Sequence, residues 1–75
     1  MHMDLMHVQL GTEYRILHID AGDGELESFL FSLGCYAGEH ITVVSRLKSG
    51  CTVAIKDGRY HIDSNLASAI RVAEQ

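Results

Sequence analysis

The sequence is poor in cysteine and in aromatic residues, and it contains no tryptophan and no proline. Its two cysteines, Cys35 and Cys51, are too few for a disulfide framework, and their spacing is not that of a Cys-x-x-Cys motif. In a reducing compartment both are expected to be small buried thiols. A nucleophilic cysteine would also need a base and an orienting group nearby, and no motif supplies them. We therefore expect no enzyme.

Long apolar runs are also absent, and no stretch approaches the ~20 apolar residues that span a bilayer. The first residues lack the basic segment and apolar stretch that mark a secretory signal. No linker, repeat or low-complexity segment divides the 75 residues. We therefore expect a single domain over residues 1–75, located in the cytoplasm and not inserted directly into a membrane.

Basic residues are few, since six Lys and Arg against ten Asp and Glu leave a formal net charge of −4. Non-specific binding to nucleic acid depends on basic side chains that neutralise phosphates. Anchoring to an anionic membrane depends on a similar basic patch. Both functions are therefore disfavoured, and we expect no nucleic-acid partner.

The clearest local pattern is a short helix over about residues 24–33 that ends at Gly34. Asp23 is a candidate N-cap, and a glycine after the last turn adopts the left-handed conformation without steric cost. Four apolar residues share one helix face by the i, i+3, i+4, i+7 rule: Leu26, Phe29, Leu30 and Leu33. We expect this face to cover the neighbouring strands as a lid.

Five segments have the alternating pattern of strands, at residues 14–20, 40–47, 51–56, 59–63 and 69–73. In the first segment, Leu17 and Ile19 are predicted to face the core and Ile16 the opposite side. Asp57 and Gly58 are predicted to form the turn of a hairpin between the third and fourth segments. The polar break Asp63-Ser64-Asn65 is predicted to cap a single helical turn over residues 66–68, before the last strand.

Together these segments predict a small, partly open β-barrel, because closure protects the edges that a flat sheet of this size would expose. Burial of each large aliphatic side chain stabilises such a core by roughly 1.5–3 kcal/mol. Six inward-facing residues form the predicted core, namely Ile41, Val43, Val53, Ile55, Ile70 and Val72.

Several short motifs occur in a fixed order along nearly the whole chain. They are Val-Gln-Leu-Gly at residues 8–11, Leu-Gly at Gly34, a second glycine at Gly38, Ile-x-Val-Val at residues 41–44, and Leu-Ala-x-x-Ile-x-Val at residues 66–72. In this order and at these spacings the sequence resembles the FeoA family. The resemblance implies a mainly β, SH3-like, five-stranded, partly open barrel, with one short α-helix (about residues 24–33) inserted after the first long strand.

Proteins of the FeoA family are small and cytoplasmic, are associated with the membrane ferrous-iron transporter FeoB, and are not known as enzymes. The resemblance therefore implies an accessory protein of ferrous iron transport. It would dock on the cytoplasmic region of a FeoB-type transporter and lie peripheral to the inner membrane through this partner. The alternative is a metal- or ligand-responsive regulatory domain, because the same fold forms the C-terminal domain of iron-dependent repressors. Weak self-association of the chain is also considered.

Metal ligands were sought because the resemblance points to iron. The candidates are His18, His61 and Asp20, since His18 and His61 could meet across strands, as could Asp20 and Asp63. Ferrous iron or zinc would suit such ligands. However, no pair has the short Cys/His spacing that brings ligands together. We therefore predict surface or half-buried histidines, with no metal site and no required cofactor.

Four acidic residues lie close together at the start of the predicted helix, at Asp20, Asp23, Glu25 and Glu27. They could form a weak cation site. Capping by Asp23 and the favourable interaction of carboxylates with the positive end of the helix dipole explain them equally well, and this interpretation is preferred.

A partner-binding surface is predicted around Phe31. This residue lies away from the apolar helix face, so the helix cannot bury both. Together with Tyr36 in the following turn, it could form an apolar patch flanked by Glu27 and Glu39, and aromatic residues are favoured at the centres of interfaces. Burial of Phe31 under the N-terminal segment is the alternative.

Overall fold

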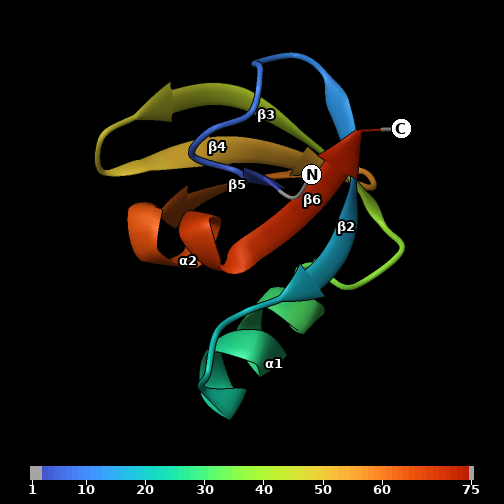
Figure 1. The fold of residues 1–75 in the computed structure, drawn as a ribbon, viewed down its shortest axis with the longest axis vertical. Helices are drawn as coiled ribbons and strands as arrows, with labels where there is room; N and C mark the ends of the chain where they lie inside the picture. The colour runs from blue at the N-terminus through green and yellow to red at the C-terminus, as the bar shows by residue number, and fades with distance from the viewer. Residues whose placement is uncertain (1–2, 75) are drawn as a thin grey trace.

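The structure is a computed structural model that describes residues 3–74, and there the chain forms one antiparallel sheet and two short helices (Figure 1). The strands are β1 (Met3–Asp4), β2 (Glu13–Ile19), β3 (His40–Leu47), β4 (Gly50–Ile55), β5 (Gly58–Asp63) and β6 (Ile70–Glu74), and the helices are α1 (Gly24–Ser32) and α2 (Ser64–Ala69). The strands follow the order β1-β6-β2-β3-β4-β5. The predicted mainly β fold is confirmed, with β1 as a sixth, very short strand.

Helix α2 covers the opening between the two edge strands, β1 and β5. It contacts both of them as well as β4 and β6. The cap predicted within residues 63–65 is Asp63, whose carboxylate accepts a hydrogen bond from the backbone N–H of Leu66 at 2.8 Å, and the helix is longer than the single turn predicted. The backbone N–H of Leu5 donates to the carbonyl of Ala67 at 3.3 Å and so joins the N-terminal segment to the helix.

Helix α1 does not cover the sheet, so the prediction of an apolar lid is wrong. Only Leu30 is fully buried, whereas Leu26 is 36% and Phe29 49% exposed. The helix projects from the end of β2 (Figure 1), and its last turn is held by a hydrogen bond from the Cys35 N–H to the Leu30 carbonyl at 2.9 Å. Because only this last turn reaches the core, most of the predicted apolar face remains exposed.

The inward face of β2 also differs from the prediction. Tyr14 and Ile16 are buried, while Leu17 is only half-buried. The register between β2 and β6 shifts between Ile16 and His18, and such a bulge moves the residues that follow it to the opposite face. Ile19, beyond the bulge, packs partly against the core as expected.

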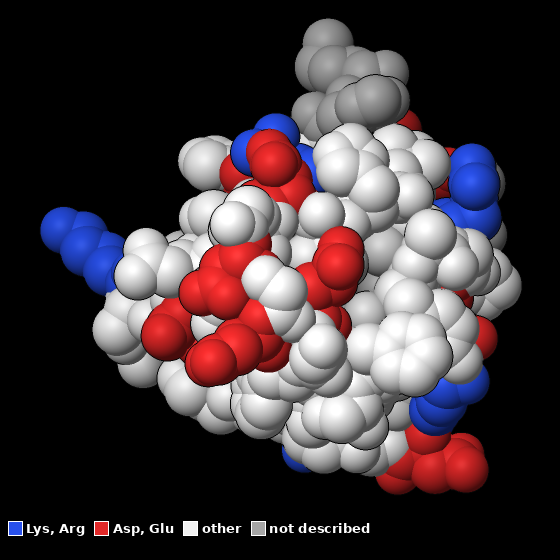
Figure 2. All heavy atoms as spheres, turned by 90° about the horizontal axis from the view of Figure 1, so that it is seen from below, with Lys and Arg blue, Asp and Glu red and all other residues white. Residues whose placement is uncertain are grey.

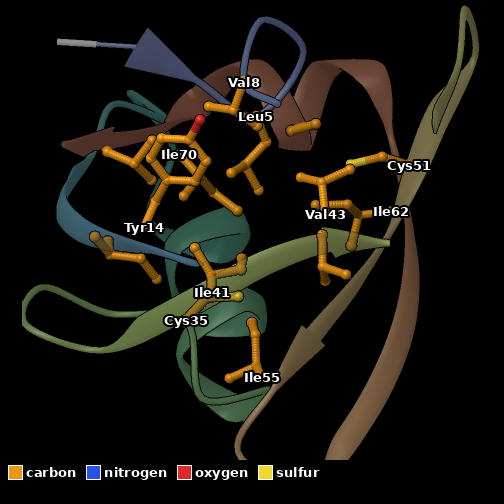
Figure 3. Packing of buried hydrophobic residues seen from close by; sticks show 14 of the residues in the cluster. Leu5, Val8, Tyr14, Cys35, Ile41, Val43, Cys51, Ile55, Ile62 and Ile70 are labelled. Carbon is orange, nitrogen blue, oxygen red and sulfur yellow. The ribbon is translucent and has the colours of Figure 1, made fainter. Parts of the chain in front are cut away.

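The hydrophobic core lies between the sheet, α2 and the N-terminal segment (Figure 3). All six predicted core residues are buried, which confirms the alternation in β3, β4 and β6. Leu5 and Val8 from the irregular N-terminal segment join them. The guanidinium of Arg46 on β3 donates to the carbonyls of Leu5 at 3.3 Å and Val8 at 2.7 Å, and it thereby holds this segment over the core.

The hairpin between β4 and β5 turns one residue earlier than predicted. Ile55 pairs with Gly58, so Lys56 and Asp57 form the turn. Lys56 has a φ of 52°, in the left-handed region that few residues with a side chain adopt. Within residues 3–74, neither helix has the length and apolar character needed to cross a membrane.

Candidate functional site

The candidate site is built on a pair of aromatic rings, Phe31 and Tyr36, which we call the aromatic ridge. Phe31 lies in the last turn of α1 and Tyr36 in the turn that follows the helix, and their ring centroids are 5.0 Å apart at an interplanar angle of 36°. Phe31 is 63% exposed. In the described part of the chain, the N-terminal segment therefore does not bury it, and the alternative of an exposed aromatic surface is the one the structure supports.

Lys56 completes the ridge on the side of the β4–β5 hairpin. Its ammonium lies 5.3 Å from the centroid of the Tyr36 ring and 3.1 Å from a carboxylate oxygen of Glu39. Hydrogen bonds raise the pKa of Lys56, and the one to Tyr36 contributes more than the one to Glu39. Gly34 leaves room for this side chain, since a Cβ at that position would come within 3.1 Å of the Lys56 Cε.

Sequence reasoning missed Lys56 because it lies far along the chain from Tyr36 and no local pattern connects the two residues. Gly34 and Gly38 indicated a turn after the helix, but a turn does not show which distant side chain packs against it. Only the pairing of β4 with β5 and the left-handed conformation of Lys56 place its side chain beside the ring. The contact is thus a product of the tertiary structure.

A groove between β2 and α1 borders one side of the aromatic ridge, and we call it the β2–α1 groove. Its volume is about 410 Å³, and it is lined by His18, Ile19, Glu27, Ser28, Phe31, Cys35, Tyr36 and Ala37. Cys35 forms a buried part of this wall, and burial raises the pKa of its thiol to about 12. The thiol is therefore protonated at neutral pH and serves as an apolar surface rather than as a nucleophile.

A second groove lies on the other side of the ridge, between the end of α1 and the β4–β5 hairpin. Its volume is about 590 Å³, and Phe31 and Tyr36 line it as well as the first groove. Lys56 and Asp57 place opposite charges on its wall. We call it the hairpin groove. The ridge therefore separates two hollows of different charge.

The structure brings the four predicted partner-binding residues together around this ridge. Phe31 and Tyr36 form its centre, Glu27 lines the β2–α1 groove, and Glu39 is paired with Lys56 on the opposite flank. Their arrangement matches the patch expected from the sequence. That they bind a partner stays a prediction.

The candidate metal ligands are not brought together. His18 is on β2 and His61 on β5, both are exposed, and β3 and β4 lie between their strands in the sheet. Asp20 is paired with Arg71 at 3.2 Å, and Asp63 caps α2. No group of three or more His, Cys, Asp or Glu side chains suited to a metal occurs within residues 3–74.

Comparison with known protein families shows to which family the chain belongs. The family model of the FeoA domain matches residues 3–74. This chain belongs to the FeoA domain family. The match confirms the resemblance drawn from the sequence motifs. Among curated proteins, none matches the chain significantly.

Solved structures with the same fold include FeoA proteins and metal-dependent repressors. An iron uptake regulatory protein (FeoA) superposes with a TM-score of 0.86 at 23% identity, with 96% of each chain covered. Iron(II) transport protein A from Clostridium thermocellum superposes at 0.84 and 25% identity, over 93% of this chain and 44% of its own. A manganese-dependent transcriptional repressor superposes at 0.90 and 21% identity, but this FeoA-domain chain spans only 42% of its length.

Proposed function

We propose that this FeoA-domain protein is a non-catalytic accessory protein of ferrous iron transport, which docks on the cytoplasmic region of a FeoB-type membrane transporter and modulates its activity. Membership of the FeoA family supports the role in iron transport. The exposed aromatic ridge is the observation that supports docking, because it offers a contact surface beside two grooves. Docking would place the protein in the cytoplasm, peripheral to the inner membrane.

The ridge has the properties of an interface centre. Truncation of a central aromatic residue at an interface typically costs 2 kcal/mol or more, whereas most surrounding contacts contribute little. The ring of Phe31 already lies against Tyr36, and this contact reduces the side-chain freedom that binding would have to remove. It is therefore the residue expected to contribute most.

Replacement of Phe31 by alanine is expected to weaken binding to the transporter's cytoplasmic region about 30-fold, which corresponds to a hot spot of about 2 kcal/mol. Biolayer interferometry with the immobilised cytoplasmic region measures this change. Leu47→Ala is the matched control, because Leu47 is a similarly exposed apolar residue at the end of β3 and lines neither groove. Equal binding by both variants would contradict docking through the ridge, and no binding by the unaltered protein would contradict the function.

A metal- or ligand-responsive regulatory domain is the second candidate, and the fold shared with the manganese-dependent repressor supports it. This candidate predicts stoichiometric binding of ferrous iron or zinc in a calorimetric titration, lost in His18→Ala or His61→Ala. We expect instead no stoichiometric binding, because Asp20 is engaged with Arg71 and the two histidines lie on separated strands. Saturable binding at micromolar metal would favour the second candidate over the first.

A further inference from the structure

The net charge of the protein is concentrated in one short segment. Residues 20–27 contain four of the ten acidic residues and no Lys or Arg. The other six acidic residues are matched in number by the six basic residues of the rest of the chain. The whole formal charge of −4 therefore corresponds to this segment, which comprises the loop that follows β2 and the first turn of α1.

These carboxylates have few cationic partners. Asp20 is paired with Arg71, whereas neither Glu25 nor Glu27 forms an ion pair with any residue in the range 3–74. Figure 2, which views the molecule from below, shows a patch of Asp and Glu atoms left of the centre with no Lys or Arg atoms inside it, whereas other Asp and Glu atoms of this face lie next to Lys or Arg atoms. Such a concentration of one charge attracts cationic groups and accelerates their association.

The acidic segment borders the apolar β2–α1 groove. Glu27 lines this groove and also lines a smaller hollow beside Asp23 and the loop before α1. Among residues 3–74, it is the only Asp, Glu, Lys or Arg on the groove wall. The hairpin groove differs, because Lys56 and Asp57 balance each other there. Charge therefore distinguishes the two sides of the aromatic ridge.

We propose that the β2–α1 groove takes a basic segment of the partner protein, with one apolar side chain inserted between Ile19 and Phe31 and Lys or Arg residues facing Glu27 and Glu25. This inference rests on the proposed function, and it adds the chemistry of the segment that is recognised. Cys35 and Ala37 supply the apolar wall for the inserted side chain. The exposed carboxylates supply specificity and a faster association rather than most of the affinity.

The charge requirement can be separated from the folding of α1. Glu25→Gln together with Glu27→Gln removes two charges of the acidic segment, of which Glu27 lines the groove, whereas Glu13→Gln together with Glu74→Gln removes two charges from exposed positions that line neither groove. Both double variants change the net charge equally. Thermal unfolding by circular dichroism checks that each is folded at the assay temperature, since loss of carboxylates from the first turn of a helix removes a small dipole interaction.

The expected result is selective weakening of binding by the first double variant. Binding is measured with two probes: the transporter's cytoplasmic region, and a synthetic peptide that carries a leucine flanked by lysines. Glu25→Gln/Glu27→Gln should weaken binding to each probe about fivefold at ~0.1 M salt, as expected for the loss of two exposed ion pairs. The control variant should bind both probes as tightly as the unaltered protein. The difference should largely vanish at ~1 M salt, where the Debye length falls to ~3 Å.

A third variant tests the apolar part of the site. Ala37→Phe places a large side chain into the groove from an exposed position of its wall, and it should abolish peptide binding while leaving the fold intact. A peptide with glutamates in place of the lysines should not bind the unaltered protein. Equal peptide binding by the Ala37→Phe variant would show that the peptide is held elsewhere and would overturn the inference.

The two proposals fail in different ways. If the transporter region binds but neither salt nor the Glu25/Glu27 variant affects it, this inference is wrong and the proposed function stands. If the basic peptide binds in the groove but the transporter region does not, the proposed function is wrong and the recognition chemistry stands. If neither probe binds, both are wrong.

Discussion

Replacement of Leu30 by alanine is expected to lower the free energy of unfolding by about 2–5 kcal/mol, the usual cost of removing a fully buried leucine side chain. Leu30 is the one residue of α1 that is completely buried, and the hydrogen bond from the Cys35 N–H to its carbonyl closes the helix onto the core. Urea unfolding followed by far-ultraviolet circular dichroism measures the change. Because the domain is small, this loss is a large fraction of its total stability.

Phe29→Ala is the matched control for this prediction. Phe29 lies on the same helix and was expected from the sequence to share the buried face, but it is 49% exposed. Its truncation should cost about 1 kcal/mol or less, in line with surface substitutions. A cost equal to that of Leu30→Ala would mean that the exposed flank of α1 is covered in solution, as self-association through this helix would produce.

Gly50→Ala is expected to destabilise the fold by about 1–3 kcal/mol or more, the range found when atoms are forced into a filled space. Gly50 begins β4 opposite Asp63, at the point where β5 ends and α2 begins. A Cβ there would collide with the carbonyl oxygen of Ile62 and come within 2.8 Å of the Asp63 Cα. Both are backbone atoms, so no side-chain rotation relieves the clash.

Gly24→Ala, in contrast, is expected to stabilise the fold. Gly24 is the first residue of α1, is exposed, and has no atom within 4 Å of the position that a Cβ would take. Alanine restricts the unfolded chain and favours helix, so a gain of about 0.5–1 kcal/mol is expected. Thermal unfolding of the two variants under the same conditions compares them directly. If Gly50→Ala lowered the stability only slightly, the backbone at Ile62 and Asp63 would have to move away from the start of β4 at little cost, contrary to this prediction.

The aromatic ridge illustrates how far the sequence reaches towards a functional surface. The off-face position of Phe31 and its closeness to Tyr36 in the chain are local properties, and they indicated a patch of two rings as one of two alternatives; the rings are in contact. The grooves beside the ridge are not local properties. They arise because β2 ends beside α1 and because the β4–β5 hairpin brings Lys56 to Tyr36.

The sequence by itself determined the elements that depend on neighbours within a few residues. The alternation in β3 to β5, the caps at Asp23 and Asp63, and the left-handed turn at Gly34 all follow from side-chain size, hydrogen-bonding groups and glycine's freedom at positive φ. The concentration of negative charge at residues 20–27 is likewise a property of the sequence alone.

The tertiary structure decided which of several equivalent surfaces became buried. The bulge between Ile16 and His18 changed the face that β2 turns to the core beyond Ile16, and α2 rather than α1 filled the opening of the sheet, so Leu26 and Phe29 stayed exposed. Strand order separated His18 from His61. Each outcome depends on contacts between residues that are distant in the chain, and local sequence patterns do not reveal the free energy of such contacts.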